Sequence, residues 1–214
     1  MSITNAKRRI NSTGSFSLAE KRAVKSILDD VYTDYAADLA AADLVLGDPV
    51  AVATAAEHGA GAIGTAAVPA TYRWSENGVI ITQTKIDLTG LAASATADDV
   101  IGLAAGGNAF IGRNVVATNG VIFKVTFSCI ETPVGGDLDV NAVANSSGTL
   151  AYDGAGGTTY LSDSGTLTAG QTIENLVPAL TANHYFYLTG GSTTTGTYTA
   201  GQYVLTTWGH ALLA

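Results

Sequence analysis

Alternating hydrophobic and polar positions over the last two thirds of the chain predict β-strands. From Ile80 to Leu88 every second residue is apolar or threonine, which places these side chains on one face of a strand. A second alternation fills 121–130, a segment rich in β-branched and aromatic residues. Its expected inward set is Val121, Phe123, Val125, Phe127 and Cys129.

Turn residues separate these strands from further short apolar segments. Asn77-Gly78 predicts a tight turn before 79–88, and Thr118-Asn119-Gly120 predicts a hairpin that joins strands 110–116 and 121–130. Thr96 to Asp99 predict a short helical turn that reaches Leu103. Further strands are expected at 138–144, around 165–167, and at 171–177, 184–188, 197–199 and 203–208. Short strands at this spacing are typical of a β-sandwich or jelly roll.

The periodicity is helical nearer the N-terminus. Ser17 and Glu20 have capping-box spacing, so the pattern predicts one long amphipathic helix over 17–46. Its apolar stripe consists of Val24, Ile27, Leu28, Val31, Tyr35 and Leu39. Such a stripe needs cover from the body of the protein or from a neighbouring subunit.

Four segments therefore follow one another along the chain. Residues 1–16 are expected to form a flexible basic arm, and 17–46 the helix. Residues 47–71 are rich in Ala, Gly and Thr and are expected to form a linker or extended arm. Residues 72–214 are expected to form an antiparallel, jelly-roll-like β-sandwich, which makes the chain mainly β.

Composition supports a folded chain, and its charge is unevenly distributed. Hydrophobic residues make up 47% and charged residues only 13%, which argues against disorder. Residues 1–25 contain six cations and one acid, a net charge of +5. Because the whole chain carries −8, the remainder carries −13. A basic arm ahead of an acidic body suggests an acidic partner for the arm and disfavours nucleic acid as a partner for the body.

The expected compartment follows from the cysteine count and the hydrophobic runs. Cys129 is the only cysteine, so no internal disulfide can form, and its apolar surroundings predict burial. The N-terminus lacks the apolar region of a signal peptide, and no segment is apolar over the ~20 residues of a membrane span. We therefore expect synthesis in a reducing cytoplasm and no membrane partner.

Lys7, Arg8 and Arg9 are the most suggestive polar group. Three interpretations stay open for them: a disordered solubilising tail, a tether to an acidic protein surface, and a contact with nucleic acid. Nucleic acid is the least expected, because three charges bind it weakly at physiological salt.

The sequence offers little catalytic or metal-binding chemistry. Asp137 and Asp139 share one face of a strand, and a solvated strand face is favoured over a calcium site or a paired-acid glycosidase site. His58, His184 and His210 lack ligand spacing, and there is no Gly-x-Ser-x-Gly or Walker motif. We therefore expect no enzyme activity, no catalytic residue, no metal and no cofactor.

Aromatic residues gather in the last strands. Tyr185, Tyr187, Tyr198, Tyr203 and Trp208 would form either a core or subunit interface, the favoured interpretation, or a platform on which sugars stack.

Five segments of the chain resemble virion structural proteins of tailed phages, especially marine podovirus-like ones. The segments are 72–80, 85–91, 131–139, 183–191 and 196–205, and the last two are the most specific. The resemblance implies a capsid decoration (cement) protein on the virion surface. Its implied partners are the major capsid protein and further copies of the chain in a homotrimer. The alternatives are a receptor- or glycan-binding fibre or tail module and, far less expected, an enzyme such as a glycan hydrolase.

Overall fold

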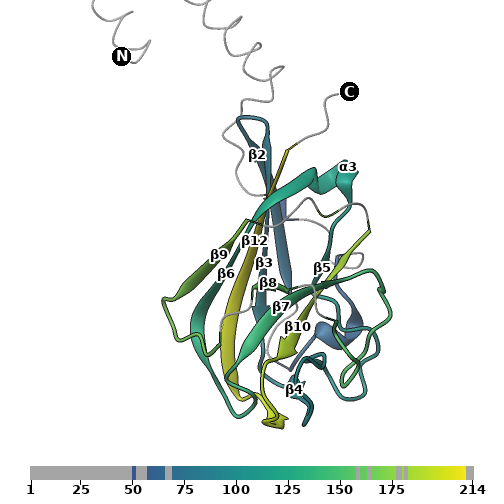
Figure 1. Ribbon diagram of the computed structural model, residues 1–214, viewed down its shortest axis with the longest axis vertical. Coiled ribbons are helices and arrows are strands. Elements are labelled where there is room, and N and C mark those ends of the chain that lie inside the picture. Colours follow the sequence, from purple (N-terminus) through teal and green to yellow (C-terminus); the bar gives the residue numbers. More distant parts are fainter. Residues whose placement is uncertain are drawn as a thin grey trace, which may run out of the picture. The chain divides into compact units, whose positions relative to one another are not determined.

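Two antiparallel β-sheets that face each other across a shared core make up most of the described chain (Figure 1). The computed structural model describes residues 50–51, 57–65, 69–157, 160–162, 165–176, 180 and 183–210. All of these belong to one unit, Gly47–Ala214. The expectation of a mainly β chain with antiparallel pairing is confirmed for them.

The larger sheet has six strands in the order β1-β2-β3-β12-β6-β9, and the smaller has four in the order β5-β10-β7-β8. A third, two-stranded sheet pairs β11 with β4. The strands are β1 (Val50–Ala51), β2 (Ala70–Glu76), β3 (Val79–Asp87), β4 (Ala92–Ala93), β5 (Gly112–Arg113), β6 (Val121–Val134), β7 (Val140–Asn145), β8 (Tyr160–Ser162), β9 (Thr172–Asn175), β10 (Tyr185–Gly190), β11 (Gly196–Thr197) and β12 (Ala200–His210). The described helices are one 3-10 turn, η2 (Ala60–Ala62), and one short α-helix, α3 (Val116–Asn119).

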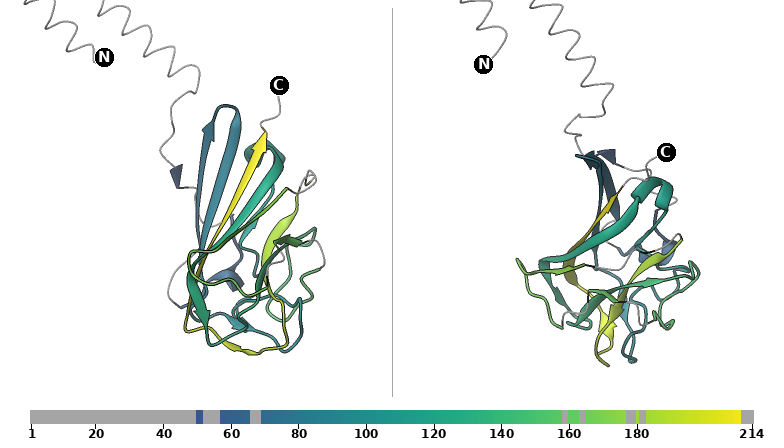
Figure 2. Two further views of the ribbon diagram at one scale, coloured as in Figure 1. Left: turned by 60° about the vertical axis from the view of Figure 1, so that its left-hand side comes forward. Right: turned by 45° about the horizontal axis from the view of Figure 1, so that its top comes forward.

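The chain crosses repeatedly between the two main sheets. It passes from β3 in the larger sheet to β5 in the smaller, and returns to β6. It then forms β7 and β8, crosses to β9, crosses again to β10, and ends as β12. Figure 2 shows the two layers from the side. Each strand of the two main sheets therefore has one face toward the space between the sheets.

That space is filled by apolar side chains from both layers. Ile86, Phe127 and Tyr203 come from the larger sheet, and Phe186 and Leu188 from the smaller. The Phe127 and Tyr203 rings stack with centroids 4.7 Å apart and planes 5° from parallel. Burying side chains of this size is worth about 1.5–3 kcal/mol each, so these contacts hold the two layers together.

A β-bulge changes the side-chain pattern that the sequence predicts for 121–130. The β6–β12 register shifts between Trp208 and Gly209, which leaves Phe123 as the extra residue. Val125, Phe127 and Cys129 point inward as expected, but Phe123 lies on the outer face. A bulge shifts the alternation by one residue, so strict alternation was wrong at this end of the strand.

The predicted hairpin at Thr118-Asn119-Gly120 is wrong. Its two strands, β5 and β6, belong to different sheets, and α3 lies between them. Gly120 has φ +69° and ends α3, a position that favours glycine. The Asn119 side chain accepts a hydrogen bond from the Val115 N–H. Asn119 and Gly120 therefore end a helical turn and do not form a hairpin.

Other strand predictions are largely confirmed, with shifts of a few residues at the ends. One strand prediction was wrong among the described residues, because 165–167 is not a strand. The short helical turn predicted to begin at 96–99 was also wrong. Asp98 adopts φ +66°, a backbone conformation that a right-handed helical turn excludes. The short strands β1, β4 and β8 were missed.

Residues 57–65 form a strap along the body, inside the range expected to be a linker or extended arm. The Gly59 N–H donates to Phe110 O (2.8 Å), Gly61 N–H to Asn108 O (2.7 Å) and Thr65 N–H to Thr89 O (2.8 Å). A Cβ on Gly61 would lie 2.3 Å from Gly107 O, and one on Gly64 would lie 2.1 Å from Thr89 O. The small residues of the strap therefore allow its backbone to pack directly against the backbone at Gly107 and Thr89.

The N-terminal expectations concern other residues. The arm at 1–16 with Lys7, Arg8 and Arg9 lies outside the described residues, as does the helix at 17–46 with its stripe. Within the described ranges, no helix has the length and hydropathy to cross a membrane.

The strap yields the first prediction. Gly61→Ala and Gly64→Ala should each destabilise the protein by about 1–3 kcal/mol, because the added methyl group overlaps a backbone carbonyl. Urea unfolding followed by circular dichroism measures the change. Ala60→Ser, at an exposed strap position, is the control and should leave the midpoint unchanged. Wild-type stability in both glycine variants would contradict this packing.

Candidate functional site

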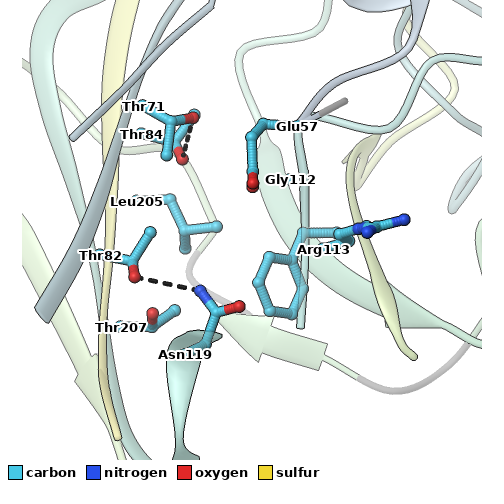
Figure 3. A pocket seen from close by; sticks show the side chains of 10 residues that line it. Glu57, Thr71, Thr82, Thr84, Gly112, Arg113, Asn119, Leu205 and Thr207 are labelled. Carbon is cyan, nitrogen blue, oxygen red and sulfur yellow. Dashed lines mark hydrogen bonds between the residues drawn. The ribbon is translucent and has the colours of Figure 1, made fainter. Parts of the chain in front are cut away.

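A polar cleft lies between the two main sheets. Four threonines of the larger sheet form one wall, and residues of the smaller sheet and the strap face them (Figure 3). The lining residues are Glu57, Thr71, Thr82, Thr84, Gly112, Arg113, Asn119, Phe186, Leu205 and Thr207. Its free volume is about 250 Å³ including the open mouth, and its interior has room for about one water molecule.

The polar groups of the cleft mostly bind one another. The Thr71 and Thr84 hydroxyls share a hydrogen bond of 3.2 Å, and Asn119 Nδ2 donates to Thr82 Oγ1 at 3.0 Å. Glu57 pairs with Arg73 at 3.5 Å. Figure 3 shows Arg113 extending away from the threonines, and its buried Nε has no hydrogen-bond partner among the described residues. This arrangement suits an ordered water more than a substrate.

Asp137, one of the two acids considered for calcium, is buried and holds a loop in place. Its carboxylate accepts hydrogen bonds from the Asp139 N–H (2.9 Å), the Ser192 N–H (2.8 Å) and the Ser192 hydroxyl (2.9 Å). Three donors aimed at one carboxylate occupy the oxygens that a cation would need. Asp137 therefore fixes the loop at Ser192.

The described residues contain no group of three or more His, Cys, Asp or Glu side chains placed to hold a metal. His210 stacks on Phe123 with ring centroids 4.4 Å apart, and His58 is buried in the strap. The Asp139 N–H donates a hydrogen bond to Asp137 Oδ1, and the Asp139 carbonyl accepts one from the Gly191 N–H (2.6 Å).

The aromatic residues of the last strands do not form one surface. Tyr187, Tyr198 and Tyr203 are buried, and Tyr185 lies on the smaller sheet against Phe110. Burial raises the pKa of Tyr187 to about 12, and it also raises the pKa of Tyr198 and of Tyr203. These tyrosines are structural, as the core interpretation predicted. The lone Cys129 is also buried, and this burial raises its pKa.

Trp208 takes a different position, on the outer face of the larger sheet. Ile81 of β3 lies directly opposite both Trp74 of β2 and Trp208 of β12. Directly opposed residues of antiparallel strands point to the same face, so the three side chains form one row. Lys124 lies opposite Trp208 on β6, with its Nζ 4.9 Å from the indole centroid. We call Trp74, Ile81, Trp208 and Lys124 the indole row.

Sequence reasoning missed Trp74 as a member of this surface, although a signal was present. A two-residue turn at Asn77-Gly78 places Glu76 opposite Val79, and counting back places Trp74 opposite Ile81. The pairing of Ile81 with Trp208 carried no such local signal, because the two residues are far apart in the chain.

Comparisons of the chain with protein families, with curated proteins and with solved structures find no match.

The role of Asp137 can be tested by removing its charge. Asp137→Asn should destabilise the protein by about 2 kcal/mol, because an amide nitrogen would replace one acceptor oxygen beside buried donors. Urea unfolding measures the loss, and Asp153→Asn at an exposed position is the matched control. A thermal midpoint that rises with added calcium and falls in chelator would contradict the loop-fixing role.

Proposed function

We propose that this protein is a virion structural protein, a decoration or cement subunit on the outside of a tailed-phage head. The observation that carries the proposal is that the chain enters and leaves the β-module at the same end. Val50 lies opposite Arg73, and His210 lies opposite Val79 beside the β2–β3 turn. The first and last described strands therefore bring the two ends of the module to the same end of the larger sheet.

The fold itself supports the proposal. We infer that the module is a β-sandwich of the jelly-roll kind, because eight strands divide into two four-stranded sets, β3-β12-β6-β9 and β5-β10-β7-β8. Jelly rolls of this construction recur in viral capsid domains. The likeness of five sequence segments to phage virion proteins favours the same class, and the major capsid protein is the partner in this proposal.

The basic N-terminus supplies the attachment in this proposal. Residues 1–25 carry +5 while the rest of the chain carries −13, so the front of the chain is the part attracted to an acidic capsid surface. Lys7, Arg8 and Arg9 are the proposed tether. The stripe of residues 17–46 would then be covered by a neighbouring subunit.

Self-association into a homotrimer is part of the proposal. Ile130 and Val134 are each 52% exposed, four residues apart on β6, and Leu138 follows at 46%. Apolar side chains at this exposure favour contact with another chain, because burying them removes apolar surface from water.

Removing residues 1–46 tests attachment. The remaining unit, Gly47–Ala214, should keep its β-sheet circular dichroism but bind heads stripped of the protein more than about tenfold more weakly, because the cationic segment is lost. Co-sedimentation with purified heads measures binding. The triple variant Lys7→Gln, Arg8→Gln, Arg9→Gln isolates the tether in a full-length chain. Undiminished occupancy with the truncated protein would overturn the attachment model.

Association can be tested separately in solution. The wild type should have the mass of three chains by light scattering, and Ile130→Asp with Val134→Asp should shift it toward one chain, because the charges would be buried unpaired. Leu176→Asp is the control, an exposed leucine at the other end of the sheet. A monomeric wild type at all concentrations would remove the trimer from the proposal.

A further inference from the structure

The indole row places two partly exposed tryptophan side chains on the outer face of the larger sheet. Ile81 is only 8% exposed, yet it belongs to neither apolar cluster and lies on the face opposite the core. Its direct cross-strand neighbours on that face are Trp74 and Trp208, both partly exposed. The two tryptophans therefore flank Ile81 on this face, and each keeps part of its side chain exposed.

Hydrogen-bonding groups border this aromatic surface. Lys124 Nζ lies over one face of the Trp208 ring, 4.9 Å from its centroid, and 2.8 Å from Glu174 Oε2. On the same face, Gln83 Nε2 donates to Thr206 Oγ1 at 3.5 Å, a long and exchangeable bond. Aromatic rings with donors and acceptors beside them match the two sides of a pyranose: its C–H face and its hydroxyl groups.

The charge of the row narrows the ligand class. Its one cation is already paired with Glu174, and the whole chain carries −8. An anionic glycan would meet the repulsion of this net negative charge, and the lysine of the row is already paired with Glu174. The row therefore matches neutral sugars better than sialylated or sulfated ones.

We propose that the indole row binds neutral pyranose oligosaccharides by stacking on Trp74 and Trp208. The alternation of strands β2, β3 and β12 spaces the two indoles two strands apart, about 10 Å between their backbones. A chain of linked sugars laid across the strands would therefore contact both rings. This inference goes beyond attachment to a head and does not depend on it.

The protein supplies its own reporter, because Trp74 and Trp208 are its only two tryptophans. The full-length protein is titrated with cellohexaose, chitohexaose and mannohexaose, and tryptophan emission is recorded. Saturable change is expected with at least one of the three. Trp74→Ala and Trp208→Ala should each weaken binding roughly tenfold or more, since each removes one stacking ring.

Two sets of variants separate stacking from folding. Trp74→Phe and Trp208→Phe keep a ring, should bind within about threefold of wild type, and each leaves one emitter to report its own position. Thr172→Ala, an exposed position on β9 opposite Ser128 and away from the indoles, should bind as wild type. Circular dichroism confirms that each variant keeps its sheet.

Three results would overturn the proposal. One is the absence of any saturable change up to about 10 mM of all three sugars, far above a useful affinity. Another is binding that survives the double variant Trp74→Ala, Trp208→Ala. The third is an emission change that depends on protein concentration alone, which would assign the row to contact with a second copy.

Discussion

The insertion of β12 between β3 and β6 is the constraint on which the rest of the structure depends. This last described strand pairs with β3 from Gln202 to His210 and with β6 over its whole length. Tyr203 and Leu205 on its inner face complete the core, and Trp208 on its outer face completes the indole row. Because these partners are far apart in sequence, their pairing costs loop entropy before the core repays it, which is typical of slowly folding β-proteins.

The larger sheet uses its inner face in two ways. Toward one end, Ile86 and Leu88 pack in the core; toward the other, Thr82 and Thr84 line the cleft. Both sets belong to one continuous alternation over 80–88, which covers β3 and the residue after it. Threonine keeps the β-branched shape that suits a strand while its hydroxyl needs a partner. The hydroxyl–hydroxyl and Asn119 bonds supply those partners, so the sheets can separate at this end without leaving these groups unsatisfied.

Local patterns in the sequence predicted most strands, the antiparallel class and the burial of Cys129, because alternation and turn residues act over a few positions. Features set by distant segments were not predictable in the same way. Asn119-Gly120 has the composition of a hairpin, but the next strand pairs elsewhere, and the pair ends a helix instead. The tyrosines near the C-terminus are neighbours in sequence, yet alternate crossings between sheets send them to different layers. The strap glycines were interpreted as linker residues, because composition alone does not distinguish flexibility from close backbone contact.

The two proposals place opposite demands on the outer face of the larger sheet. The indole row lies in the half of that sheet where the chain enters at Val50 and leaves at His210, the end assigned to attachment. Stacking of a sugar requires this face to be open, whereas close contact with a capsid would cover it. Quenching of the tryptophan emission by a neutral solute can be compared between free protein and protein on heads. The comparison indicates whether this face stays open on heads or is covered by them. Equal quenching would mean that attachment holds the module clear of the shell and that both roles are compatible. Protection on heads would confine sugar binding to the unattached protein.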